Sequence, residues 1–376
     1  MCKTILPPST IGIIGGGQLG RMMAISARQM GYRIAALEPG RDSPLGQIAD
    51  IELNAAYDDK IALTELLEKS DVVTYEFENV PYSTIRELSS RGNLPQGPMP
   101  LMITSHRLRE KLAIEEAGYT VAPFLAVMSK DELKYAVNKI GYPCILKTSS
   151  GGYDGKGQWV LQTDADLPEV LEIADDNEYV LEGFVNFTKE VSVIVTRSVN
   201  GDVKAFPVTE NKHVNQILHL SIAPARIDES LCNEAKQIAM GLIEKLDFIG
   251  TLAIEMFVTE NGIVINELAP RPHNSGHWTI DGCNVNQFEQ HIRAICGLSL
   301  IDAQVHGYAV MINLLGQHAQ HALTAWQKPE FSDAKLHMYG KEELKRDRKV
   351  GHINFVGNDW TELEAKVNSF LENFPK

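Results

Sequence analysis

The sequence has no hydrophobic run long enough to cross a membrane. A membrane-spanning helix needs about 18 consecutive apolar residues, and the longest apolar stretch, around Gly307 to Gly316, is about half that length. The N-terminus also lacks a basic segment followed by an apolar one, which is the pattern of a secretory signal peptide. We therefore expect a cytoplasmic protein that does not bind membranes.

Cysteine is scarce, and acidic residues outnumber basic ones. No two cysteines form a CxxC pair, which argues against zinc and redox motifs and favours structural thiols at Cys2, Cys144, Cys232, Cys283 and Cys296. Asp and Glu total 49 against 35 Lys and Arg, so the formal charge is -14. This balance opposes binding to a phosphate backbone, and we expect no nucleic-acid partner.

The length and composition are those of a globular protein with several domains. At about 150 residues per domain, 376 residues predict two or three domains. Hydrophobic residues make up 44% and charged residues 22%, which excludes a disordered chain. The stretch NLPQGPMP, at 93–100, is dense in proline and glycine and predicts the end of a first domain.

The first domain begins with a strand, a glycine turn, a helix and a second strand. These are IGII, GGGQLG, MMAISARQMG and RIAAL, between Ile11 and Leu37. With DVVTY at 71–75 as a further strand, the pattern predicts the start of a doubly wound parallel sheet. The preceding segment, MCKTILPPST, resembles a disordered lead.

The glycine turn has the GxGxxG spacing. It is formed by Gly15, Gly17 and Gly20, and Glu38 ends the next strand. Such glycines let a phosphate approach the backbone at a helix N-terminus, and the acid binds a ribose, so the pattern indicates a dinucleotide site. Two other interpretations stay open: a turn that only packs helix on strand, and a site for one phosphate of a smaller nucleotide.

A second glycine loop, GGYDGKG at 151–157, follows the strand that contains Lys147. It is not a Walker loop, because Lys156 is followed by Gly157 and not by Ser or Thr. Flexible glycines and a lysine suit a lid that closes over a triphosphate. A plain hairpin is the alternative.

Two glutamates lie on consecutive strands, TLAIEMFV and GIVINEL. If the loop between them is the three residues 260–262, Glu255 lies directly opposite Glu267. Opposed like charges destabilise a sheet, so a cation between them is expected, and oxygen ligands favour Mg²⁺. A loop of only Asn261 and Gly262 would place the glutamates on different faces, and two exposed glutamates on an edge strand are the alternative.

Polar side chains crowd the segment LAPRPHNSGH that follows. Arg271, His273, Asn274, Ser275 and His277 lie within seven positions. A guanidinium group offers a planar fork to an oxyanion, so the cluster indicates an anion site.

These motifs in this order resemble the ATP-grasp superfamily and, within it, the 5-(carboxyamino)imidazole ribonucleotide synthases. The resemblance rests on GIIGGGQLGRM, YEFENVP, ILKTSSGGYDGKGQWV, INELAPRPHNSGH and RKVGHINF, and it extends from about Ile11 to Phe355. It implies an α/β fold with a Rossmann-like pre-ATP-grasp domain at 1–104, an ATP-grasp domain at 105–300 with its lid at about 123–190, and a small α+β domain at 301–376.

The resemblance also implies an activity. In this family, ATP and bicarbonate form carboxyphosphate, and the amine of 5-aminoimidazole ribonucleotide is then carboxylated, with release of ADP and phosphate, in purine biosynthesis. The cofactors implied are ATP and Mg²⁺ or Mn²⁺. A homodimer is implied as well, together with a separate mutase that receives the product.

Site residues follow from the resemblance by position. The nucleotide set is Arg107, Lys147, Gly152, Tyr153, Asp154, Gly155, Lys156, Gly157, Gln158, Glu182, Gly183, Phe184, Val185, Glu190, His213, Asn266 and Glu267. Glu255 and Glu267 would hold the metal ion. The ribonucleotide set is Gly17, Gln18, Leu19, Glu78, Asn274, Lys341 and Arg348, and the catalytic set is Tyr153, Asp154, Lys156, Arg271 and His273. His106 stands where the family usually has Asp, which puts a local salt bridge in doubt.

Three rival functions use part of the same pattern. A nicotinamide or flavin oxidoreductase would explain GxGxxG but not the second glycine loop or the glutamate pair. Another ATP-grasp ligase, such as a formate-using transformylase or a biotin carboxylase-like subunit, would not explain YEFENVP and RKVGH. A non-catalytic nucleotide sensor would be expected to lack the two glutamates.

Overall fold

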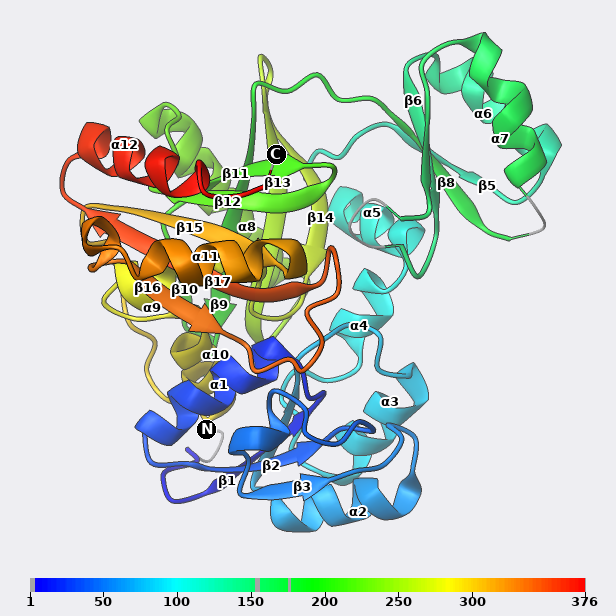
Figure 1. The fold of residues 1–376 in the computed structure, drawn as a ribbon. Helices are drawn as coiled ribbons and strands as arrows, with labels where there is room; N and C mark the ends of the chain where they lie inside the picture. Colours follow the sequence, from blue (N-terminus) through cyan, green and yellow to red (C-terminus); the bar gives the residue numbers. More distant parts are fainter. Residues whose placement is uncertain (1–3, 153–155, 175–176, 376) are drawn as a thin grey trace.

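The computed structural model describes residues 4–152, 156–174 and 177–375, which form three β-sheets covered by helices (Figure 1). A four-stranded sheet belongs to the N-terminal part, a nine-stranded sheet forms the centre, and a second four-stranded sheet forms a lid. The lid projects at the upper right of Figure 1, and α4 (Met99–Thr104) and α5 (Arg107–Glu116) lie between it and the N-terminal sheet. The mixed α/β fold confirms the expectation from sequence.

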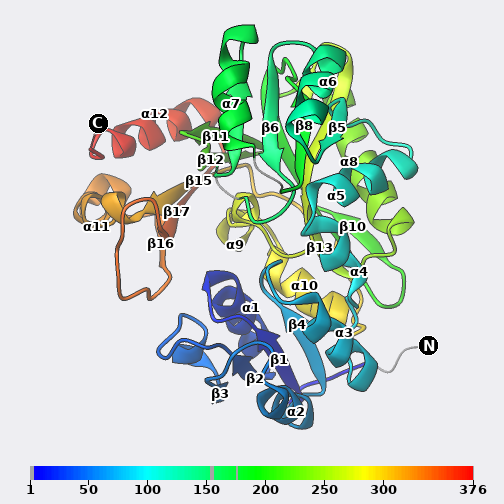
Figure 2. The same ribbon diagram turned by 90° about the vertical axis from the view of Figure 1, so that its right-hand side faces the viewer.

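The N-terminal sheet is parallel, with strand order β3-β2-β1-β4, as predicted. One of its faces packs against α1 and also against α10 of the central part, while α2 and α3 cover the other. Figure 2 shows α10 beside β4. The elements are β1 (Thr10–Ile14), α1 (Gln18–Gln29), β2 (Arg33–Leu37), β3 (Ile51–Leu53), α2 (Lys60–Lys69), β4 (Val72–Tyr75), α3 (Tyr82–Arg91) and α10 (Gln287–Ile295).

The segment before β1 is ordered against the body, so the prediction of a disordered lead is wrong for residues 4–9. Ile5 is buried, its amide donates to the Cys296 carbonyl at 2.9 Å, and its carbonyl accepts from the Tyr32 hydroxyl at 2.7 Å. Burial of one isoleucine and two satisfied backbone groups outweighs the low propensity of a Pro-Pro segment.

The central sheet has the order β14-β13-β9-β11-β12-β15-β17-β16, with β10 paired to β9. The pairing of β12 with β15 carries the sheet into the C-terminal part, and α8 packs on its ATP-grasp half. Its elements are β9 (Lys189–Arg197), β10 (Val203–Ala205), β11 (Thr209–Val214), β12 (Ile217–Ala223), α8 (Glu229–Lys245), β13 (Gly250–Thr259), β14 (Gly262–Ala269), α9 (Thr279–Gly282), β15 (Tyr308–Leu315), α11 (Ala319–Trp326), β16 (Lys335–Met338), β17 (Lys349–Gly357) and α12 (Trp360–Leu371).

The lid is an antiparallel sheet of order β5-β8-β6-β7 with its own core. Its helices bury leucines, valines and alanines against one face of the sheet. The elements are β5 (Phe124–Val127), α6 (Lys130–Ile140), β6 (Cys144–Thr148), β7 (Gln158–Leu161), α7 (Leu167–Ile173) and β8 (Tyr179–Gly183).

In the hairpin of β13 and β14, Glu255 lies opposite Glu267, but the turn and the register differ from those considered from the sequence. Thr259 pairs with Gly262, so the turn is formed by Glu260 and Asn261, which is neither of the two loops considered from the sequence. The register then shifts at Asn266, which is the extra residue of a β-bulge, and Glu255 lies opposite Glu267 after all. The bulge restores the shared face that a two-residue turn alone would have removed.

Two other expectations concern the cysteines and the membrane. Cys144 and Cys296 are buried, and burial raises the pKa of their thiols to about 11 and about 12, as expected for structural cysteines. Cys232 and Cys283 are partly buried, and Cys2 lies outside the described residues. Within the described ranges, no helix has the length and hydropathy that a membrane crossing requires.

A buried carboxylate ties the central sheet to the C-terminal helix α12. Glu210 accepts two bonds from the Arg226 guanidinium, at 2.9 and 2.5 Å, one from the Arg226 amide at 3.3 Å and one from Lys189 at 2.7 Å. Arg226 also pairs with Glu364 of α12 at 3.2 Å and covers the Trp360 ring. Burial raises the pKa of Glu210, but its cationic partners lower it further, to about 2.

Replacing this carboxylate should cost stability in a pH-dependent way. We expect Glu210→Gln to lower the free energy of unfolding at pH 7 by about 1–3 kcal/mol, because Arg226 and Lys189 lose a buried partner. The folded-state pKa lies below the unfolded value, so the contribution is present above about pH 4.5 and disappears as the pH falls toward about 2.

Urea unfolding at several pH values checks this expectation. Glu364→Gln is the matched control, because it removes a half-exposed partner of the same arginine and should cost less than about 1 kcal/mol. Equal losses in both variants, or a loss independent of pH, would contradict the assignment.

Candidate active site

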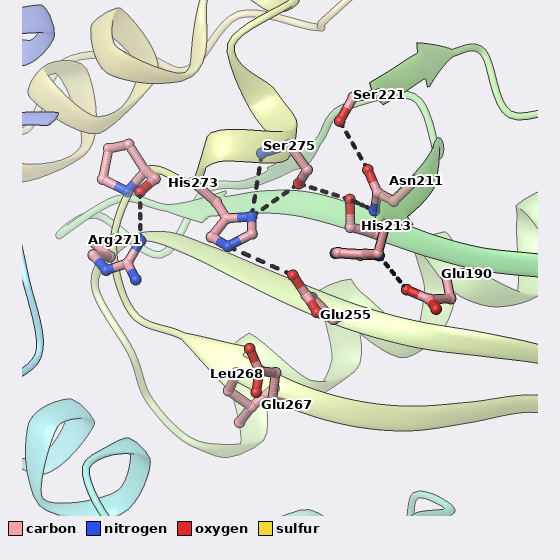
Figure 3. Close-up of polar contacts among 12 residues, drawn as sticks. Glu190, Asn211, His213, Ser221, Glu255, Glu267, Leu268, Arg271, His273 and Ser275 are labelled. Carbon is pink, nitrogen blue, oxygen red and sulfur yellow. Dashed lines mark hydrogen bonds and ion pairs between the residues drawn. The ribbon is translucent and has the colours of Figure 1, made fainter. Parts of the chain in front are cut away.

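Two opposed carboxylates form the centre of the candidate site. Glu255 and Glu267 are paired across β13 and β14 (Figure 3), with Arg107 3.7 Å from Glu267 and His273 3.6 Å from Glu255. Burial raises the pKa of the Glu255 carboxyl to about 7, with a further contribution from the charge of Glu267. Both carboxylates are thus held at a place where a cation would relieve their repulsion.

This donor set fits a hard divalent cation. The carboxylates of Glu255 and Glu267, with the bulged Asn266 between them in sequence, offer only oxygen ligands, which Mg²⁺ prefers. Among the described residues no cluster of three or more His, Cys, Asp or Glu could hold a metal. Two carboxylates are therefore too few for a cage made by protein alone, but Mg²⁺ is ordinarily held by one or two carboxylates together with phosphates.

A buried ion triad lies between the lid and α5. Glu182 of β8 lies between Lys147 of β6, at 3.0 Å, and Lys111 of α5, at 3.2 Å. Burial raises the pKa of Glu182, but the two lysines lower it further, so it stays ionised. Burial also lowers the pKa of Lys147. The triad leaves one net positive charge at the base of the lid.

The predicted adenine segment is the end of β8 and the residues after it. The amide of Gly183 donates to the Pro123 carbonyl and that of Phe184 to the Pro143 carbonyl, both within the lid. Those two amides are therefore already used within the lid, and Glu182 is paired with both neighbouring strands.

Glu190 and His213 form an ion pair on neighbouring strands of the central sheet (Figure 3). The Glu190 carboxylate lies 2.5 Å from His213 Nδ1. Burial lowers the pKa of His213, but the bond from Glu190 and the charge of Glu255 raise it further, so the net shift is upward. Both residues thus lie close to the acidic pair, as the nucleotide set requires.

The second glycine loop joins β6 to β7. Gly157 has a φ of +71°, and a Cβ there would lie 2.6 Å from the Thr148 hydroxyl, so this position requires glycine. Gln158 bonds to Gln216 in the turn between β11 and β12, so the lid contacts the central sheet. Gly152 is described as well, whereas the predictions for Tyr153, Asp154 and Gly155 lie outside the described residues.

The first glycine turn is occupied by carboxylates of the chain itself. Glu76 accepts from the amides of Gly17 and of Gly20, the latter at 2.6 Å. Glu38, the residue expected to bind a ribose, accepts from Gly16 at 2.7 Å and from Tyr57 at 2.5 Å. These contacts remove the donors and the acid that a dinucleotide needs, and the dinucleotide interpretation is therefore wrong.

Amides remain at the start of α1, next to a cleft of about 460 Å³. Among the described residues, the amides of Gln18 and Leu19 have no partner in this turn, and the first turn of a helix binds an anion readily. The cleft brings Gly17 and Gln18 together with Lys341 and Arg348, as predicted. Burial, with the charge of Arg348, lowers the pKa of Lys341 to about 8.

Arg271 joins this N-terminal part to the acidic pair. Its guanidinium donates twice to Glu78, at 2.5 and 3.0 Å, across the interface between the two parts. Burial raises the pKa of Glu78, but Arg271 lowers it further, so the net shift is downward. Asn274 nearby is buried, and its side-chain nitrogen is without a hydrogen-bond partner among the described residues.

A chain of hydrogen-bonded serines and an asparagine fixes the orientation of the His273 ring through Ser275 (Figure 3). The Ser275 amide and hydroxyl contact Nδ1 at 3.3 and 2.9 Å, so this nitrogen accepts and the proton of the neutral ring lies on Nε2, toward Glu255. Ser192, Asn211 and Ser221 continue the chain at 2.8 to 2.9 Å. Burial and the charge of Arg271 keep the pKa of His273 well below its usual range.

The departure at His106 is compensated locally. Its Nε2 lies 3.2 Å from Glu178, just before β8. This position therefore holds an imidazole beside a carboxylate, which differs from the contact that an Asp could make there.

Four residues of the site were not found from the sequence. Lys111, Glu110 and Glu76 are buried in it, and Lys349 acts electrostatically on Glu78, Glu255 and His273. Helical spacing could have found two of them, because positions 107, 110 and 111 share one face of α5. A larger cavity, of about 790 Å³, lies away from these groups, around Ile5, Asn93 and Ile249.

Three family models match the chain in succession. They are the ribonucleotide synthetase preATP-grasp domain at 9–104, the ATP-grasp domain at 112–288 and the phosphoribosylaminoimidazole carboxylase C-terminal domain at 309–366. A curated N5-carboxyaminoimidazole ribonucleotide synthase of Bacillus subtilis is 49% identical over 356 residues, which are 94% of this chain and 93% of the relative.

Solved structures agree with these matches. An N5-carboxyaminoimidazole ribonucleotide synthetase in complex with ADP has a TM-score of 0.95 at 51% identity, covering 98% of each chain. An Aspergillus clavatus enzyme in complex with ADP and 5-aminoimidazole ribonucleotide has a TM-score of 0.89 at 28% identity, covering 97% of this chain and 98% of that one. The chain belongs to the N5-carboxyaminoimidazole ribonucleotide synthase family of ATP-grasp ligases.

Proposed function

We propose that the chain uses ATP and bicarbonate to carboxylate the exocyclic amine of 5-aminoimidazole ribonucleotide, with release of ADP and phosphate. The observation that carries this proposal is the opposed pair Glu255 and Glu267, which has Arg107 on one side and His273 on the other. Such a site combines a place for a divalent cation with groups that bind phosphate and a second anion.

The nucleotide lies between the lid and the central sheet in this proposal. Lys147, Lys156 and Arg107 bind its phosphates, the segment Glu182 to Val185 binds adenine, and Glu190 with His213 binds the ribose. The loop Gly152 to Gln158 closes over the phosphates and excludes water. Glu255 and Glu267, with help from Asn266, would hold Mg²⁺ or Mn²⁺, which when bound would supply positive charge opposite the transferred phosphoryl group.

Bicarbonate lies between the nucleotide and the ribonucleotide. Arg271 offers a planar guanidinium to the carboxylate, and His273 presents its Nε2 proton from a ring fixed by Ser275. Tyr153, Asp154 and Lys156 of the lid loop complete this set. A bicarbonate oxygen attacks the γ-phosphorus and ADP leaves. The C–O bond of carboxyphosphate then breaks and releases phosphate and carbon dioxide. The amine attacks the carbon dioxide to form the carbamate and gives its proton to the released phosphate.

The ribonucleotide occupies the cleft of the N-terminal part. Its phosphate binds the amides of Gln18 and Leu19 at the start of α1, beside Gly17, together with Lys341 and Arg348. Glu78 and Asn274 contact its imidazole or ribose. The same proposal includes domain boundaries at 104 and 300, a homodimer and a cytoplasmic location. It also includes a separate mutase that receives the labile carbamate.

The central experiment measures ADP release with Mg²⁺-ATP and bicarbonate, with and without 5-aminoimidazole ribonucleotide. We expect ribonucleotide-dependent ADP release matched by carbon-14 incorporated from bicarbonate. ADP release that ignores the ribonucleotide would require another acceptor and would overturn the proposed substrate.

The metal assignment is tested at Glu267. Glu267→Gln keeps the shape and removes the charge, so ADP formation should fall at least about 100-fold while thermal unfolding stays close to wild type. Glu260→Gln, in the exposed turn of the same hairpin, is the matched control and should keep full activity. Turnover near the wild-type rate in Glu267→Gln would contradict the metal site.

The buried triad predicts a role for Lys111. Lys111→Met leaves Glu182 with one cation, so we expect about 2–4 kcal/mol lower stability in urea unfolding and weaker ADP binding in calorimetry. Arg109→Met, on the exposed side of α5, should change neither. If Lys111→Met is destabilised but binds ADP with unchanged affinity, the triad contributes to stability and not to nucleotide binding.

A further inference from the structure

A chain of buried polar groups connects the N-terminal sheet to the central sheet behind the site. It runs from the Thr251 amide on β13 to His291 on α10, then to Thr74 on β4, Gln96 in the connecting segment and the Pro270 carbonyl. Its four side-chain-bearing members Thr251, His291, Thr74 and Gln96 are at most 4% exposed. Nothing in the proposed reaction uses these groups.

The direction of every bond in this chain is determined. The Thr251 amide can only donate, so His291 Nδ1 accepts at 3.1 Å and the proton of the neutral ring lies on Nε2. His291 Nε2 therefore donates a hydrogen bond to the Thr74 hydroxyl at 2.8 Å, and this hydroxyl donates to Gln96 Oε1 at 2.6 Å. The Gln96 amide donates to the Pro270 carbonyl at 3.4 Å, which ends the chain.

Two members of this chain, Thr74 and Pro270, lie at the bases of the segments that meet at the site. Thr74 precedes Glu76 and Glu78, and Pro270 directly precedes Arg271. The bidentate bond between Arg271 and Glu78 needs both backbones in one fixed relative position. α10 packs beside β4 (Figure 2). His291 on α10 bonds Thr74 of β4 and Thr251 of β13, and Gln96 completes the link from Thr74 to Pro270.

We propose that Thr74, Gln96 and His291 are positioning residues that set the distance between the ribonucleotide cleft and the bicarbonate site. We call these three residues the interdomain clamp. The inference rests on the proposed function, because it concerns how carbon passes between the two substrates. It deepens that function by assigning coupling efficiency to residues that touch neither substrate.

The chemistry explains why distance matters for coupling. Carboxyphosphate has two fates: transfer of its carbon to the ribonucleotide amine, or hydrolysis, in which water regenerates bicarbonate and releases phosphate. Both fates produce one ADP per turnover, but only the first produces carbamate. A displacement of about 1 Å can change a transfer rate by up to about 100-fold, so a loosened clamp raises the share lost to water.

The experiment compares ADP formed with carbon-14 incorporated into carbamate, counted after an alkaline quench. The variants are Gln96→Met and His291→Phe, which remove the bonds and keep the volume, and Gln96→Glu, which keeps the acceptor for Thr74 but loses the donor to Pro270. We expect a ratio near one in the wild type and at least about threefold higher in each variant. The KM for the ribonucleotide should rise more than the KM for ATP.

Gln290→Met is the matched control. Gln290 is the neighbour of His291 on α10, is equally buried and makes two bonds with Ile301, at 2.6 and 3.1 Å, within its own part of the chain. It should lose a comparable amount of thermal stability while the ratio stays near one. Should His291→Phe fail to fold, the two Gln96 variants carry the same comparison.

The outcomes separate this inference from the proposed function. A ratio near one in folded clamp variants, or an equal rise in Gln290→Met, overturns the clamp and leaves the proposed function standing. Absence of ribonucleotide-dependent ADP release in the wild type overturns the proposed function and the clamp with it. A raised ratio confined to the clamp variants supports the assignment.

Discussion

The repulsion between Glu255 and Glu267 is the constraint on which the site depends. Two carboxylates opposite one another in a sheet are unfavourable without a cation. Here a bulge at Asn266 places Glu255 directly opposite Glu267. Arg107 and His273 lie beside the pair, and Lys147 and Lys111 surround a third carboxylate behind it. The opposed pair is therefore a place where a cation would relieve the repulsion between the carboxylates.

The N-terminal part shows how one glycine turn can serve a different ligand. Its sequence is that of a dinucleotide site, yet Glu76 and Glu38 take up the amides that a pyrophosphate would need. The start of α1 still points toward the cleft that contains Lys341 and Arg348. One helix terminus and two cations at this cleft are the groups that we propose for the single phosphate of the ribonucleotide.

Much of the fold could be predicted because its signals are local. The parallel sheet follows from apolar runs around a glycine turn, and the acidic hairpin from alternation on two strands. The errors have the same origin. The hairpin loop and the order of the first residues depend on a bulge and on a contact between Ile5 and Cys296, which no local pattern encodes.

The sequence by itself determined the chemistry of this protein: which acids, cations and glycines are present, and on which strand, helix or loop each lies. Tertiary structure alone decided which of them meet. Lys111 reaches Glu182 and Arg271 reaches Glu78 only because α5, the lid and the N-terminal sheet pack together, since these pairs are separated by 71 and 193 positions. Contacts over such distances follow from burial and packing of whole elements, not from neighbouring residues.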